Sequence, residues 1–86
     1  MKHITDASQM NKDTVYTFLG KHIDFIFYIK REFVNGFTCR NVSENNNFYL
    51  NRTAISEEKF YYEDYQGLKY VIYKKGTKED YPEYFL

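Results

Sequence analysis

The sequence has little of what marks a secreted, membrane-spanning or highly charged protein. A single cysteine, Cys39, cannot form an intrachain disulfide, which fits a reducing compartment. The N-terminal residues lack the apolar stretch of a signal peptide, and no apolar run is long enough to cross a bilayer. We therefore expect a cytoplasmic protein that does not use a membrane.

Net charge is also absent, because 12 Lys and Arg residues balance 12 Asp and Glu residues. A protein that coats DNA is usually clearly basic, and a mimic of nucleic acid is clearly acidic. The balance disfavours both classes, although a local basic patch is compatible with it.

Tryptophan is missing, and the helix-favouring residues Leu and Ala are scarce, whereas the 86 residues include 10 Tyr and 8 Phe. Aromatic residues favour strands, so the composition predicts a mostly β fold in one domain. The abundance of Lys, Asn, Ile, Tyr and Phe is typical of AT-rich codons and suggests a low-GC bacterium or its phage.

The chain divides into three parts by pattern. Residues 1–13 are polar and aperiodic, which suggests a flexible N-terminal arm. Residues 14–75 are expected to form one antiparallel β domain, a small sheet or an SH3-like barrel of five to six short strands. Residues 76–86 form an aromatic and acidic C-terminal tail in which Pro82 disfavours a continuing strand.

The segment 22–35 carries the most informative pattern. Alternate positions are nearly all apolar, which is typical of a strand with one buried face; they are Ile23, Phe25, Phe27, Ile29, Arg31 and Phe33. A helix is the alternative, since Ile23, Ile26, Phe27, Lys30 and Phe33 also have helical spacing. Asn35-Gly36 then predicts a hairpin turn, with 37–42 as the returning strand.

A strict two-residue turn at Asn35-Gly36 would place Arg31 opposite Arg40, and like charges destabilise a strand pair. We expect a bulge to shift the register or a carboxylate to lie nearby; a shared anion is the alternative. A second hairpin is predicted over 59–75, with its turn at Gln66-Gly67 and Asp64 opposite Lys69.

Residues for catalysis or metal binding are few. His3, His22 and Cys39 do not have the spacing of a zinc site, which needs about four ligands. The charge of Arg40 could lower the pKa of the Cys39 thiol, but a free cysteine is more often a small buried hydrophobic residue. We expect neither an enzyme nor a cofactor.

The aromatic residues indicate a surface instead, because tyrosine is enriched at protein interfaces. The sequence predicts a protein-binding module, a modulator or inhibitor encoded by a phage or mobile element and acting on a host enzyme or defence system. Exposed edge strands would also permit a homodimer. The interface candidates are Tyr61, Tyr65, Tyr70, Tyr73, Tyr81, Tyr84 and Phe85.

The alternative function is binding of single-stranded nucleic acid, in which bases stack on aromatic rings and basic side chains follow the backbone. The zero net charge disfavours it. Its candidate residues are Tyr28, Lys30, Arg31, Arg40, Arg52, Lys69 and Lys74.

Overall fold

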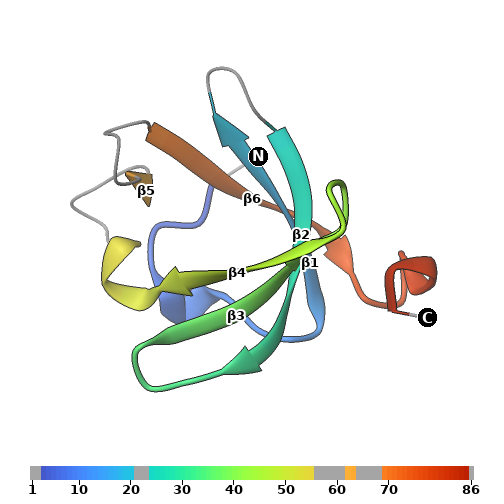
Figure 1. Cartoon of the computed structure of the whole chain (residues 1–86), viewed down its shortest axis with the longest axis horizontal. Helices are drawn as coiled ribbons and strands as arrows, with labels where there is room; N and C mark the ends of the chain where they lie inside the picture. Colours follow the sequence, from blue (N-terminus) through green and yellow to red (C-terminus); the bar gives the residue numbers. More distant parts are fainter. Residues whose placement is uncertain (1–2, 21–23, 56–61, 64–68, 86) are drawn as a thin grey trace.

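The computed structural model describes residues 3–20, 24–55, 62–63 and 69–85, and its main feature is one antiparallel sheet of six strands (Figure 1). The strands follow the order β4-β3-β2-β1-β6-β5. They are β1 (Thr14–Gly20), β2 (Asp24–Glu32), β3 (Gly36–Asn41), β4 (Asn46–Asn51), β5 (Tyr62–Glu63) and β6 (Lys69–Thr77). Within the described residues β4 does not pair with β5, so the sheet is open. The mostly β prediction is confirmed as a sheet rather than a barrel.

Helical structure in the described ranges is limited to three short 3-10 turns. They are η1 (Ala7–Gln9), η2 (Arg52–Ala54) and η3 (Pro82–Phe85). In the segment 22–35, for which strand and helix are the alternatives, Asp24–Glu32 form β2, so the strand is confirmed there and the helix is wrong.

The core lies on one face of the sheet and is built mainly from aromatic rings. Phe27 is fully buried, and its ring lies 5.4 Å from that of Tyr16 and 5.4 Å from that of Phe48. Phe18 stacks on Phe25 at 4.9 Å. These rings come from β1, β2 and β4, so the aromatic core holds the successive strands together.

The N-terminal segment, expected to be a flexible arm over 1–13, contributes directly to this core. Ala7 and Met10 are both 5% exposed and belong to the core cluster. The backbone N–H of Ile4 donates to the carbonyl of Ile72 at 2.7 Å, which ties the segment to β6.

The β2–β3 hairpin contains the bulge that the two arginines led us to expect. Register shifts between Ile29 and Arg31, so Arg40 lies opposite Tyr28 rather than Ile29. Arg31 lies opposite Thr38, a pairing that follows from the backbone hydrogen bonds between Phe33 and Gly36 at the turn. Arg31 and Arg40 therefore do not lie opposite each other.

The turn of this hairpin differs from the prediction by one residue. Phe33 and Gly36 exchange backbone hydrogen bonds of 2.8 and 3.3 Å, so the turn residues are Val34 and Asn35. Gly36 instead begins β3, where an added Cβ would lie 2.4 Å from the Leu50 carbonyl oxygen. A close approach of β4, rather than turn geometry, explains the glycine.

The predicted register of the second hairpin is wrong by one residue. Glu63, not Asp64, lies opposite Lys69. The expected turn itself lies outside the described residues.

Candidate protein-interaction surface

The face of the sheet opposite the core, called the outer face below, stays partly open. Side chains alternate between the two faces along each strand, and the described side chains on this face, apart from Val15, are half-buried or exposed. They include Thr17 and Leu19 of β1, Ile26 and Tyr28 of β2, Thr38 and Arg40 of β3, Tyr49 of β4 and Tyr73 of β6.

Aromatic side chains from the C-terminal segment gather against this outer face. Phe85 lies 4.3 Å from the ring of Tyr28, and Tyr81 stacks on Tyr84 at 5.5 Å with 4° between the ring planes. We call these four residues, together with Tyr73 on β6, the aromatic patch. All five are half-buried.

Val15 is the buried residue at one end of the outer face. It lies opposite Tyr28 in the β1–β2 pair and is 0% exposed, yet it does not belong to the core cluster. Phe85 of the C-terminal segment packs on Tyr28, the residue opposite Val15.

Hydrogen bonds fix the start of the C-terminal segment. Thr77 donates from its backbone N–H and its hydroxyl to Oδ2 of Asp80, at 2.9 and 3.1 Å. These bonds favour the ionised carboxyl and lower the pKa of Asp80. The Lys78 N–H donates to the Asp13 carbonyl at 2.7 Å, which anchors the segment beside β1.

Gly76 makes room for the patch. A Cβ at this position would lie 2.7 Å from the Tyr81 ring and 3.0 Å from Oδ2 of Asp80. The absence of a side chain therefore lets Tyr81 lie directly against β6.

Two lysines lie over rings of the patch. Lys75 Nζ is 5.4 Å from the centre of the Tyr81 ring, and Lys78 Nζ is 4.7 Å from that of Phe85. A shallow groove beside Tyr81 continues across the outer face and is lined by Thr17, Leu19, Tyr73, Lys74 and Lys75. The patch thus combines apolar area with a basic border.

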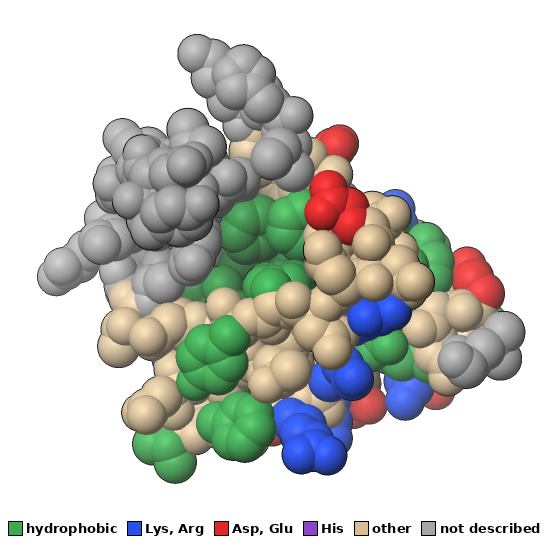
Figure 2. Space-filling model, in the orientation of Figure 1, with side chains coloured by type: hydrophobic (Ala, Val, Ile, Leu, Met, Phe, Trp, Pro, Cys, Tyr) green, Lys and Arg blue, Asp and Glu red, His purple; other side chains and the backbone are tan. Residues whose placement is uncertain are grey.

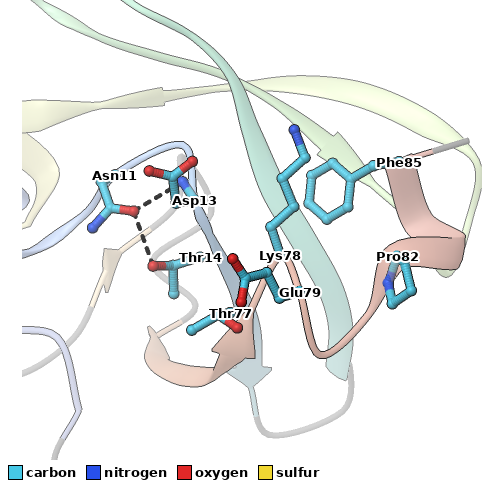
Figure 3. Close-up of a pocket in the computed structure, with 8 residues that line it drawn as sticks. All are labelled: Asn11, Asp13, Thr14, Thr77, Lys78, Glu79, Pro82 and Phe85. Atoms are coloured by element: carbon cyan, nitrogen blue, oxygen red, sulfur yellow. Dashed lines mark hydrogen bonds between the residues drawn. The ribbon is translucent and has the colours of Figure 1, made fainter.

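A second, open pocket lies where the start of β1 meets the C-terminal segment (Figure 3). Oδ1 of Asn11 accepts hydrogen bonds from the Asp13 N–H and the Thr14 hydroxyl, both at 2.9 Å. Lys78 and Phe85 lie on its other side in Figure 3. The pocket therefore lies between Asp13, which accepts the anchoring hydrogen bond from the Lys78 N–H, and Phe85 at the aromatic end of the C-terminal segment.

A smaller exposed apolar group lies at the tip of the β2–β3 hairpin, and sequence reasoning missed it. Val34 is 93% exposed, Phe33 47% and Tyr49 49%. Hydrophobic side chains are visible in Figure 2 in the region where Figure 1 shows this hairpin. The bulge explains the error, since the extra residue in β2 moves Phe33 off the face that the alternation predicted.

The structure brings four of the seven predicted interface residues together, namely Tyr73, Tyr81, Tyr84 and Phe85. Tyr28, predicted for the nucleic-acid alternative, joins the same patch. Tyr61 and Tyr65 lie outside the described residues. Tyr70 lies in β6, but its side chain is not among the described ones.

The basic residues of the nucleic-acid alternative are spread over the chain. Arg40 donates to Asn47 at 3.1 Å and also to Asn45. Arg52 donates from Nε to the Phe33 carbonyl at 2.9 Å, and its guanidinium lies 4.3 Å from the centre of the Phe37 ring.

Lys30, Arg31 and Lys74 are exposed, and the Lys69 side chain is not described.

Cys39 behaves as a buried hydrophobic residue. It is 0% exposed, and desolvation raises the pKa of its thiol to about 12. A lowering of that pKa by Arg40 is therefore not found. Among the described residues, no group of three or more His, Cys, Asp or Glu side chains could hold a metal ion.

Comparisons with protein-family models, curated proteins and solved structures gave no match to this chain. None of the helices in the described part of the chain has the length and apolar character to span a membrane.

Proposed function

We propose that this chain is a protein-binding module that docks on another protein through the aromatic patch. The observation that carries the proposal is the gathering of Tyr28, Tyr73, Tyr81, Tyr84 and Phe85 on the outer face, half-buried and held by neighbours. Tyrosines give large, rigid contact area with a polar tip and lose little conformational entropy on binding.

The patch is organised in advance of binding. Asp80, Gly76 and the Lys78–Asp13 backbone bond hold the C-terminal segment in place. A partner therefore does not have to order this segment, and less binding free energy is lost to entropy.

A modulator or inhibitor of a host enzyme or defence system is the role we propose for such a module. A chain of 86 residues gives little room for a catalytic pocket beside its own core, whereas a docking surface needs only one face. Residue usage typical of AT-rich codons supports a phage or mobile element of a low-GC bacterium as its source.

Protein is favoured over nucleic acid as the partner because the rings of the patch already contact one another. Base stacking needs a free ring face, but Tyr81 and Tyr84 stack together and Phe85 lies against Tyr28. The arginines Arg40 and Arg52 are also engaged by amides, a carbonyl and a ring.

Single-stranded nucleic acid is the second candidate, and the lysines beside the patch favour it. Lys75 and Lys78 could contact phosphates while Tyr73, which does not take part in the Tyr81–Tyr84 stack, receives a base. Such binding would weaken strongly as salt is raised.

Affinity purification from a low-GC bacterial lysate, with and without nuclease, tests the proposal. The bait proteins are the wild type, the double variant Tyr81→Ala/Tyr84→Ala and the control Val34→Ala, which removes an exposed apolar side chain away from the patch.

We expect one dominant protein that survives nuclease, is retained by V34A and is lost with the double variant. Circular dichroism checks that all three baits are folded. Enrichment that disappears with nuclease, or that is unchanged in the double variant, would contradict the proposal.

A further inference from the structure

The two edges of the sheet are protected very differently. At one edge, the described part of β5 is Tyr62–Glu63, and the N-terminal segment also pairs with β6 on this side through the His3–Tyr73 bridge and the Ile4–Ile72 bond. At the other edge, β4 runs for six residues, and no described residue pairs with its outer side.

β4 lacks the devices that usually keep an edge strand from pairing with another chain. Its sequence, Asn-Asn-Phe-Tyr-Leu-Asn, contains no charged residue and no proline. Its pairing with β3 is continuous from Gly36–Asn51 to Asn41–Asn46 without a bulge.

The hydrogen bonds of the neighbouring strand show which groups of β4 point outward. Gly36 and Val42 bond toward β2, so Phe37, Cys39 and Asn41, which alternate with them, bond toward β4. Their partners in β4 are Leu50, Phe48 and Asn46. The N–H and C=O groups of Asn47, Tyr49 and Asn51 therefore point away from the sheet.

From this arrangement we propose that β4 pairs antiparallel with β4 of a second copy, with Tyr49 on the two-fold axis. This register aligns Tyr49 with the partner's Tyr49 and Asn47 with the partner's Asn51, and uses the outward backbone groups of all three residues. On the core face it sets Phe48 beside the partner's Leu50.

A second copy suits this edge because every pair in the register is complementary. Aromatic lies opposite aromatic, amide opposite amide and apolar opposite apolar, and like charges never face each other. The zero net charge of the chain also adds no repulsion between copies. Tyr49, 49% exposed in the single chain, would gain cover.

The dimer goes beyond the proposed function and leaves it intact. The aromatic patch is anchored on β1, β2 and β6, whereas β4 is the far edge of the sheet. Two patches would then be carried by one continuous sheet, so each dimer would be bivalent for its partner.

Disulfide trapping tests the register. Directly opposite residues of a hydrogen-bonded antiparallel pair have Cα atoms about 5.5 Å apart, within the range that a disulfide spans. Tyr49→Cys should therefore cross-link to a dimer under mild oxidation, and Val34→Cys, exposed but off the edge, should not. The native Cys39 does not interfere, because it is buried.

Sedimentation equilibrium provides the second measurement. The wild type and Tyr49→Phe should dimerise, whereas Tyr49→Lys, which opposes two positive charges on the axis, should raise the dimer Kd by about tenfold or more. A monomeric wild type, or equal cross-linking of Y49C and V34C, would overturn the proposal. Neither result bears on binding by the aromatic patch, which the Tyr81→Ala/Tyr84→Ala double variant tests separately.

Discussion

The two faces of the sheet use aromatic residues in different ways. On the core face, phenylalanines such as Phe18 and Phe27 are buried in contact with one another. On the outer face, tyrosines such as Tyr28, Tyr73 and Tyr81 are half-buried. The difference is chemical, because a phenyl ring has no polar atom to satisfy, whereas a hydroxyl needs water or a partner.

Tyr16 is the exception on the core face and supports the same explanation. Its ring is 1% exposed, but its hydroxyl accepts a hydrogen bond from the Asn11 N–H at 2.9 Å. Burial raises the pKa of this hydroxyl, so it stays protonated. A tyrosine is buried here because a partner for its hydroxyl is at hand.

The largest expected effect is on the core face. Phe27→Ala should lower the free energy of unfolding by about 3–5 kcal/mol, since it removes the ring that contacts Tyr16, Phe18, Phe25 and Phe48. Urea denaturation followed by circular dichroism measures this change. A loss below about 1 kcal/mol would mean that the ring cluster is not the core.

Gly36→Ala comes next, because its Cβ would meet the backbone carbonyl of Leu50 at 2.4 Å. We expect a loss of about 1–3 kcal/mol of unfolding free energy, typical of overpacking, since a paired strand cannot easily move away. The same urea titration measures it, and an unchanged midpoint would show that β3 and β4 do not approach so closely.

Gly76→Ala sharpens the comparison, because its Cβ meets side chains of Tyr81 and Asp80 rather than backbone. We expect it to displace Tyr81 and weaken partner binding several-fold, while stability falls by less than in Gly36→Ala. Nuclear magnetic resonance of the tyrosine rings and pull-down yield measure the two effects. Full binding with a displaced Tyr81 would remove that residue from the interface.

The smallest effect concerns pH and the exposed Asp80. The Thr77 hydrogen bonds lower its pKa in the folded chain, so its contribution to stability is fully present above the ordinary value of 3.8. That contribution is lost as pH falls through the lower folded value. The Tyr81 and Tyr84 ring resonances should therefore shift below about pH 4 in the wild type.

Asp80→Ala provides the control for this titration. Its ring resonances should show no comparable step, since the carboxyl that holds Thr77 is gone. Equal titration of both proteins would contradict a role for Asp80 in positioning the patch.

Local pattern was sufficient to predict much of the fold. The alternation in 22–34 identified β2, and the Arg31–Arg40 conflict correctly indicated a bulge. The turn at Val34-Asn35 was not predicted, because Gly36 was interpreted as a turn residue, whereas it begins β3 where β4 approaches closely. Because the predicted alternation did not include the bulge, it placed Phe33 on the core face.

The sequence could suggest interface candidates but not which surface of the fold they lie against. The C-terminal tail was predicted as an interface because it contains three aromatic residues, Tyr81, Tyr84 and Phe85, within a short and otherwise polar segment. Contact of Phe85 with Tyr28 joins residues 57 positions apart, and no local pattern encodes such a contact. For the same reason nothing in the sequence indicated that Tyr28, a candidate for the nucleic-acid alternative, contacts the C-terminal segment.

Photocross-linking from the patch tests the central claim most directly. A photoreactive phenylalanine analogue replaces Tyr84 in one protein and the exposed Lys12 in another, and each is irradiated in a low-GC bacterial lysate. The account predicts one protein cross-linked from position 84 and not from position 12, and competed by excess wild type. Equal labelling from both positions, or cross-links only to nucleic acid, would contradict it.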